Sequence, residues 1–175
     1  MIALFDTNSA SYWIGGNEKF KFRLAQIMGE LKRKQGTLAL STVSLQEMLV
    51  YSRSNGTHDR DYQFIVERFN ILPFDEPCAI AAARLAAAVG SPNRPDRRRT
   101  RGGSATQQVR DVWQRDAAIA GTAEHHGVDI LVTADATLHT EFRDYLTRCE
   151  VRLLEEGPAP VGASEPTPSE PSSSS

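Results

Sequence analysis

Four acidic side chains stand where carboxylates could do chemistry in this chain. They are Asp6, Glu47, Asp116 and Asp135. Asp6 directly follows the apolar run 1–5, and Asp135 comes soon after the apolar run 128–132. Both runs have the pattern of short, buried, parallel strands. Because ligands of open parallel sheets bind outside the carboxyl ends of the strands, we expect both acids at one site.

Asp116 lies within the apolar stripe of a predicted helix. Apolar residues occupy positions i−4, i+3, i+4 and i+7 relative to it: Val112, Ile119, Ala120 and Ala123. No Lys or Arg follows Asp116 at i+3 or i+4. An ionised carboxylate turned toward a core needs a partner, a metal ion or a water-filled cleft.

Two of the acids also have a purely structural explanation. Asp6 could cap a helix or form an Asx turn, because Asp, Thr and Asn are common cap and turn residues. Glu47 follows Ser44 at the spacing of a capping box. The apolar neighbours of Glu47, Val43 and Val50, equally allow it to face the crevice of the other acids. Both interpretations remain open for each residue.

Four carboxylates in one crevice would repel one another and raise one another's pKa. Divalent cations relieve that repulsion, and an all-oxygen site without Cys or paired His selects Mg²⁺ or Mn²⁺ over zinc. Mg²⁺ keeps several waters and is commonly completed by phosphate oxygens, so a phosphate ester is the expected substrate.

The elements that position the acids alternate between strands and helices, which predicts an α/β fold. We expect strands at 1–5, 37–41, 70–74, 128–132 and 149–154, the last at a sheet edge. We expect helices after Asn17, over 42–53, 62–69 and 76–89, after Asp111, and over 141–146. Asp75 is expected to cap the fourth of these helices.

Length and composition predict one globular domain. The chain has 175 residues, 40% of them apolar, and we place the domain at 1–154 and a disordered Pro/Ser/Glu tail at 155–175. The net charge of −2 becomes +2 without the tail, which is too small to imply nucleic acid. No signal peptide or membrane helix is expected. Cys78 and Cys149 lack zinc-type spacing and indicate buried thiols of a cytoplasmic protein.

Residues 91–110 form an expected loop insertion with six arginines and one acid. The segment is either a solvated charge run or an arm that grips phosphates, because Arg forks match phosphate geometry. In the second case it would add affinity for a polyanion that falls with salt. The substrate-binding candidates are Arg94, Arg97, Arg98, Arg99 and Arg101.

Four segments resemble one family in the family's own order: LFDTN at 4–8, STVSLQEM at 41–48, RDAAIAGTA at 115–123 and ILVTAD at 130–135. Over residues 1–154 the chain resembles the PIN-domain nucleases, particularly the VapC-like toxin ribonucleases of type II toxin–antitoxin systems. The resemblance implies a three-layer α/β/α sandwich with a mainly parallel sheet. It also implies Mg²⁺- or Mn²⁺-dependent endoribonuclease activity on RNA, a homodimer, and a small antitoxin protein as partner.

Residue roles follow from the same resemblance. Asp6, Glu47, Asp116 and Asp135 match the catalytic, metal-binding acids, and Thr7, Asn8 and Thr133 match supporting polar positions. We expect Asp6 and Asp116 to hold the principal ion. The sequence departs from the family after Asp135, where Thr137 and Leu138 stand in place of an acid and a Phe.

Other classes fit less well. A haloacid dehalogenase-type phosphatase needs a second Asp where Asn8 stands, and a receiver domain needs a Lys that has no counterpart here. A non-catalytic RNA-binding or scaffold module of the same fold stays open, because intact acids permit chemistry without proving it. Metal-dependent turnover separates the two.

Overall fold

The computed structural model describes residues 1–56, 58–90, 103–155 and 157, and these residues form one five-stranded sheet. Its strands are β1 (Ile2–Phe5), β2 (Thr37–Ser41), β3 (Asn70–Leu72), β4 (Ile130–Thr133) and β5 (Glu150–Leu153). The order is β3-β2-β1-β4-β5, and every neighbouring pair is parallel. The predicted parallel sheet is confirmed, with β1 at its centre and β5 at an edge.

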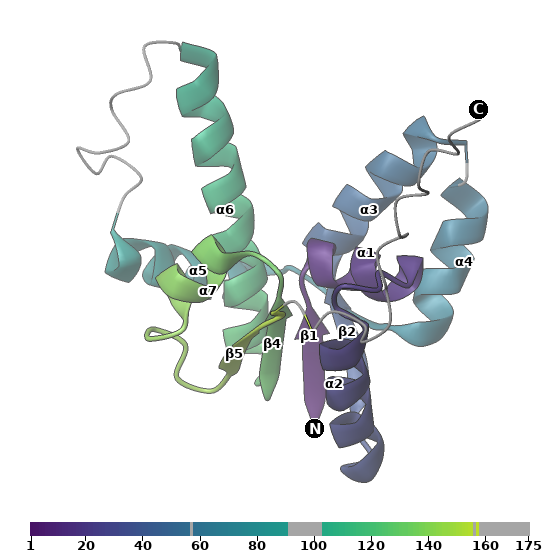
Figure 1. Ribbon diagram of the computed structural model, residues 1–175. Helices are drawn as coiled ribbons and strands as arrows, with labels where there is room; N and C mark the ends of the chain where they lie inside the picture. Colours follow the sequence, from purple (N-terminus) through teal and green to yellow (C-terminus); the bar gives the residue numbers. More distant parts are fainter. Residues whose placement is uncertain (57, 91–102, 156, 158–175) are drawn as a thin grey trace, which may run out of the picture.

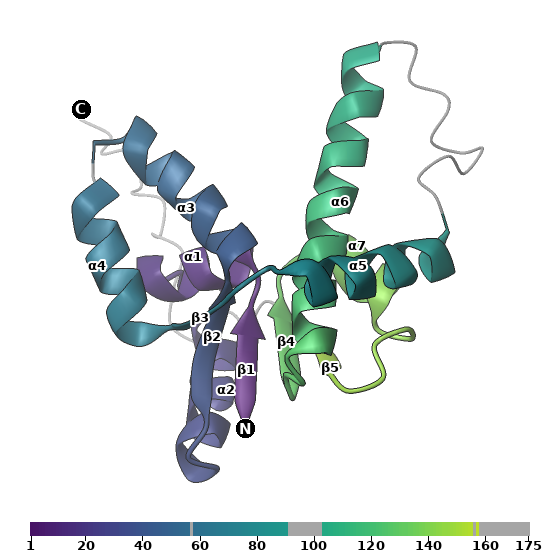
Figure 2. The same cartoon turned by 180° about the vertical axis from the view of Figure 1, so that it is seen from behind.

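Helices cover both faces of the sheet (Figure 1). They are α1 (Thr7–Gly15), α2 (Lys21–Arg33), α3 (Thr42–Ser54), α4 (His58–Arg68), α5 (Glu76–Val89), α6 (Gly103–His125) and α7 (Ala136–Phe142). The first four lie on one side of the strands and the last three on the other (Figures 1 and 2). The predicted three-layer α/β/α sandwich is therefore confirmed.

The protein has one hydrophobic core on each face of the sheet, because successive side chains of a strand point to opposite faces. Ala3 and Phe5 pack with α1, α2 and α4, whereas Leu4 between them packs with α5, α6 and α7. In β4, Leu131 faces the core under α5, α6 and α7, and its neighbours Ile130 and Val132 face the core under α1, α2 and α4. Successive side chains of a strand point to opposite faces, so short, fully apolar strands supply both layers.

The strand register brings the polar residues that follow β1 and β4 to one edge. Phe5 pairs with Leu40 on one side and with Val132 on the other. The amide of Asp6 then donates to the carbonyl oxygen of Val132 at 2.9 Å. The acids that follow these strands therefore emerge together, as the carboxyl-end argument predicts.

Three helices begin earlier than expected. Helix α4 starts at His58 and not at Tyr62. Helix α6 starts at Gly103, so the predicted cap at Asp111 is wrong and residues 103–110 of the expected loop are helical. The residues before Asp111 include Ala, Gln and Arg, which favour a helix, and no Gly or Pro stands between Gly103 and Asp111. Helix α7 starts directly after its cap Asp135, not at Glu141. Residues 91–102 lie outside the described part of the chain.

Side-chain hydrogen bonds to backbone amides set the start of α5 but not that of α2. Asp75 caps α5 by accepting from the amide of Cys78 at 3.2 Å, as predicted. Asn17 does not cap α2. Its side chain accepts from the amide of Lys19 at 3.0 Å in a turn, and α2 begins at Lys21. The chain beyond β5 stays in contact with the domain, because the amide of Gly157 donates to the carbonyl oxygen of Lys19 at 2.8 Å.

Helices α5 and α6 cross closely (Figure 2). The crossing point is Gly121, where an added Cβ would lie 2.6 Å from the backbone nitrogen of Ala82 and 2.7 Å from the carbonyl oxygen of Cys78. The missing side chain lets the two backbones approach, which fixes the end of α6 against the start of α5.

Both cysteines are unbridged and buried, as predicted. Cys78 belongs to the first turn of α5, and Cys149 directly precedes β5. Among the described residues, no helix combines the length and the apolar composition needed to cross a bilayer.

Candidate active site

A pocket of about 250 Å³ opens at the carboxyl edge of β1 and β4. Six predicted site residues line it: Asp6, Thr7, Asn8, Glu47, Asp116 and Asp135. Residues of α3 and α6 form its sides, and these two helices flank the ends of β1 and β4 in Figure 1. The structure therefore brings together the four acids that the sequence distributes over four segments.

Asp6 serves both as a helix cap and as part of the pocket. Its Oδ1 accepts from the amide of Ser9 at 2.6 Å, which caps α1. Its Oδ2 accepts from the hydroxyl of Thr133 at 2.6 Å. Burial raises the pKa of Asp6, although the hydrogen bonds from Thr133 and Ser9 act in the opposite direction. Both sequence interpretations of Asp6 are therefore correct.

Thr133 lies behind the pocket and connects two of the acids. While its hydroxyl donates to Asp6, the same oxygen accepts from the amide of Asp135 at 2.9 Å. Asp135 in turn caps α7, because its Oδ1 accepts from the amide of Thr137 at 2.6 Å. Thr133 is fully buried, so its hydroxyl fixes the carboxylate of Asp6 and the backbone of Asp135.

Glu47 is not part of a capping box. Helix α3 is capped by Ser41, whose hydroxyl accepts from the amide of Ser44 at 3.0 Å. Glu47 instead faces the pocket, where one carboxylate oxygen accepts from the hydroxyl of Thr7 at 2.5 Å and the other pairs with Arg115. The crevice interpretation of Glu47 is confirmed.

Arg115 is a pocket residue that the sequence analysis did not identify. It precedes Asp116 directly, yet it reaches across the pocket to Glu47 on α3. A search for partners at i+3 and i+4 cannot find this contact, because it joins segments that are distant in the sequence. The adjacent Arg-Asp pair was the one available signal.

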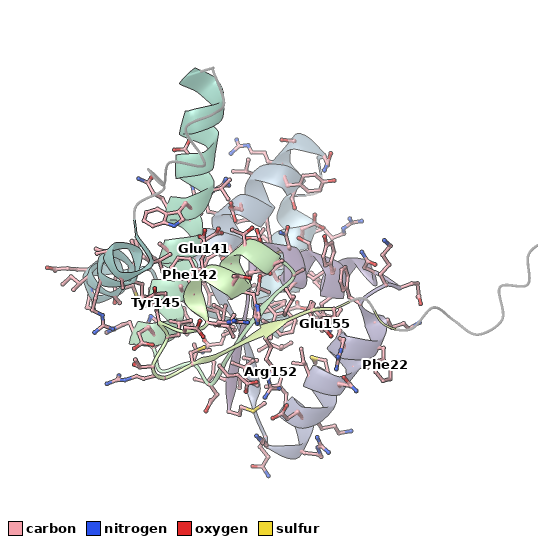
Figure 3. All side chains as sticks on the ribbon, turned by 60° about the vertical axis from the view of Figure 1, so that its left-hand side comes forward. Phe22, Glu141, Phe142, Tyr145, Arg152 and Glu155 are labelled. Atoms are coloured by element: carbon pink, nitrogen blue, oxygen red, sulfur yellow. The ribbon has the colours of Figure 1, made fainter. Side chains whose placement is uncertain are left out.

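Asp116 is a second pocket acid, after Asp6, whose pKa is raised. Burial, followed by the charges of Asp135, Asp6 and Glu141, raises its pKa to about 7. Arg115 lowers it only slightly. The fifth acid, Glu141, comes from α7 (Figure 3) and was also missed, because the sequence analysis began a helix at this residue. Acids that raise one another's pKa favour a cation between them.

The donor set fits a hard divalent ion. Described pocket residues offer carboxylate, hydroxyl and amide oxygens, with neither Cys nor His among them. Oxygen donors of this kind suit Mg²⁺ or Mn²⁺. The candidate substrate-binding arginines, residues 94, 97, 98, 99 and 101, all lie outside the described residues.

A larger hollow of about 840 Å³ lies between α2 and the edge strand β5. Its arginine on β5, Arg152, is labelled in Figure 3. This guanidinium pairs with Glu30 at 2.6 Å and with Glu150 at 2.8 Å, so its charge is balanced locally. The smaller pocket with its clustered acids is the better candidate for chemistry.

The parallel sheet and the acids at its carboxyl edge place the chain among α/β proteins that have a candidate site for a hard divalent metal ion. A family model described as "PIN domain" matches residues 3–141, and the chain belongs to this family. The predicted family membership is thereby confirmed. No curated protein sequence matches the chain.

Solved structures share the fold. A crystal structure of VapBC2 from Rickettsia felis bound to a promoter DNA fragment matches with a TM-score of 0.55 and 18% identity, covering 87% of this chain and 98% of that one. DNA-bound VapBC from Salmonella typhimurium matches at 0.56 and 17%, covering 88% and 98%. VapBC-1 from nontypeable Haemophilus influenzae matches at 0.57 and 16%, with the same coverage. At these identities the likeness concerns the fold.

Proposed function

We propose that this protein is a Mg²⁺- or Mn²⁺-dependent endoribonuclease. The observation that carries the proposal is the convergence of Asp6, Glu47, Asp116 and Asp135 on one pocket at the carboxyl edge of the sheet. Family membership and the four ordered sequence motifs support the same activity. RNA as the substrate rests on the resemblance to VapC-like ribonucleases.

Asp6 and Asp116 are the proposed principal ligands of the ion, and Glu47 and Asp135 complete the site. A bound ion would lower the pKa of an attacking water and neutralise charge on the phosphate. Thr133 orients Asp6, and Thr7 orients Glu47, through the hydrogen bonds described above. Asn8 is exposed and lines the pocket, where its amide would be available to a water or a phosphate oxygen.

Arg115 supplies a positive charge at the mouth of the same pocket. Its side chain is 46% exposed, so it can exchange Glu47 for a substrate phosphate without a large desolvation cost. The arginines at 94, 97, 98, 99 and 101 would add affinity for the RNA backbone, as proposed from the sequence.

The proposed biological role is the toxin of a toxin–antitoxin pair in the cytoplasm. The matching solved chains come from VapBC complexes, which supports a small antitoxin protein as the partner. A homodimer is proposed on the resemblance. The proposed nuclease domain spans 1–154, with an Arg-rich insertion before α6 and the tail 155–175 outside it.

The test is cleavage of structured and single-stranded RNAs by purified protein with Mg²⁺, Mn²⁺ or EDTA. Asp116→Asn is the inactivating variant. Asp144→Asn is the matched control, because Asp144 lies after α7 and outside the pocket. We expect metal-dependent cutting by wild type and the control, and at least a hundredfold loss in Asp116→Asn. Equal cutting by all three proteins would contradict the proposal.

A non-catalytic RNA-binding module is the second candidate. The observation that favours it is that three of the four acids have a structural role: Asp6 and Asp135 cap helices, and Glu47 pairs with Arg115. RNA binding without turnover under every metal condition, unchanged in Asp116→Asn, would support this candidate.

A further inference from the structure

A second group of potential metal ligands lies at the crossing of α5 and α6, outside the acidic pocket. Asp75, Cys78 and His125 each offer one ligand atom, and these three atoms lie within 4.8 Å of one another. We propose that Asp75, Cys78 and His125 bind a borderline transition-metal ion of the Zn²⁺ class. This site is separate from the proposed nuclease centre and does not depend on it.

The fold holds the three residues together. Asp75 and Cys78 stand at the cap and in the first turn of α5, and His125 is the last residue of α6. The close crossing at Gly121 fixes one helix end against the other (Figure 2). An added Cβ there would lie 2.7 Å from the carbonyl oxygen of Cys78 itself, so the approach occurs at the site.

The donor atoms select the metal. A thiolate sulphur, an imidazole nitrogen and a carboxylate oxygen form a mixed set that suits Zn²⁺, whereas the acidic pocket offers only oxygens. Three protein ligands leave one tetrahedral position for water, and Asp75 and His125 are exposed enough to admit it. Zinc binds sulphur at about 2.3 Å and nitrogen at about 2.0 Å, which places tetrahedral ligand atoms about 3.5 Å apart. The two exposed side chains would therefore close in from separations of up to 4.8 Å.

The surroundings contain both opposing and favourable contributions. The amino end of α5 disfavours a cation, whereas the carboxylate of Asp75 and the carboxyl end of α6 favour one. The Cys78 thiol donates to the carbonyl oxygen of Pro73 at 3.5 Å, and the His126 ring nitrogen lies 3.0 Å from the same oxygen. A metal ion would replace the thiol proton of Cys78, which passes to solvent, so binding should tighten as pH rises.

The sequence analysis found no zinc-type spacing for either cysteine, because Cys78 and His125 are far apart in the chain. The two residues come together only through the packing of α5 on α6. A spacing rule detects ligands on one local segment and not a site assembled by a helix crossing.

Titration of the full chain with Co²⁺ and Zn²⁺ tests the site. Co²⁺ bound to a thiolate gives a charge-transfer absorption band, and Zn²⁺ should abolish it by displacement. We expect this band in wild type and in two matched controls, Cys149→Ser and His139→Ala. We expect His125→Ala and Cys78→Ser to lose the band and at least tenfold in Zn²⁺ affinity.

His125→Ala keeps the test decisive if Cys78→Ser disturbs the core, because His125 is exposed while Cys78 is buried. Asp116→Asn separates the two proposed sites and should keep the thiolate band. Absence of the band in wild type, or Zn²⁺ affinity unchanged in His125→Ala, would overturn the proposal. Neither result depends on nuclease activity.

Discussion

Thr133 contacts Asp6 and Asp135, two acids that have both a structural role and a place at the candidate active site. Asp6 and Asp135 are each used as a helix cap, and each also lines the pocket. A cap fixes the carboxylate, because the backbone amide that it accepts from belongs to a rigid helix. The capping role therefore fixes both acids in the positions that the proposed metal site needs.

Replacement of Thr133 tests this fixed geometry. We expect Thr133→Val to reduce stability by about 1–3 kcal/mol, because two buried hydrogen-bonding groups lose their partner. Urea unfolding measures the change. Thr133→Ser keeps the hydroxyl and should recover most of the stability and RNA cleavage, and an equal loss in both variants would contradict a role for the hydrogen bonds.

The raised pKa of Asp116 predicts a pH-dependent stability of the metal-free protein. The unfolded-state pKa lies near 3.8 and the folded-state pKa is about 7. Between these values the folded state binds the extra proton, so stability is lost as pH rises from about 4 to 7. Asp116→Asn removes this dependence.

Thermal or urea unfolding in EDTA at pH 5 and pH 8 measures the effect. The stability advantage of Asp116→Asn over wild type should grow by on the order of 2–3 kcal/mol between these pH values. An advantage that is the same at both pH values would show that the carboxyl of Asp116 titrates normally.

The acids of the site could be predicted at the residue scale because each follows a recognisable local pattern. Asp6 and Asp135 follow apolar strands, and Asp116 lies in an apolar helix stripe. Arg115 and Glu141 could not be assigned in this way. Arg115 lines the pocket and Glu141 acts on the pKa of Asp116 only because separate elements pack together, which no local spacing reports.

At the scale of elements, the crossing of α5 and α6 determines where Asp116 lies. Gly121→Ala would force its Cβ to within 2.6 Å of a backbone nitrogen, which cannot move aside easily. We expect a loss of about 1–3 kcal/mol in the free energy of unfolding. Gly29→Ala in α2 is the control, since its Cβ would meet nothing within 4 Å.

These two substitutions have opposite expected signs, because helix propensity favours alanine at both positions but the close backbone opposes it only at Gly121. Alanine favours a helix over glycine by about 1 kcal/mol, so Gly29→Ala should be neutral or stabilising. If Gly121→Ala were as stable as Gly29→Ala in urea unfolding, the close crossing would not exist.

Strands and well-capped helices were the predictable elements. Asp75 caps the start of α5 and Gly90 caps its end, and the predicted span of this helix agrees with the structure. Helix α6 was misjudged, because an arginine-rich sequence was assigned wholly to a loop although its second half favours a helix. Helix α7 was misjudged because Asp135 was considered only as a site residue and not as a cap.

At the scale of the whole molecule, charge separates the proposed catalytic and binding roles. The acids of the pocket would hold the proposed cation, whereas the arginines before α6 would contact RNA phosphates. We expect the triple variant R97Q/R98Q/R99Q to weaken RNA binding on every sequence and to reduce the salt dependence of binding.

Fluorescence anisotropy on the inactive Asp116→Asn background, at several salt concentrations, measures this change without cleavage. Arg68→Gln is a suitable control, because Arg68 packs over the Phe64 ring away from the pocket. Identical salt slopes for the triple variant and the control would leave the arginine segment as a solvated charge run.

The measurement that tests the central claim most directly is the Mn²⁺ affinity of the acidic pocket, followed by electron paramagnetic resonance. Wild type, Asp116→Asn and the control Asp144→Asn would be titrated under the same conditions. If the four acids form one metal centre, wild type and Asp144→Asn bind Mn²⁺ equally and Asp116→Asn binds at least tenfold more weakly. Equal Mn²⁺ binding by all three proteins would contradict the account, because the ion would then not be held at this pocket.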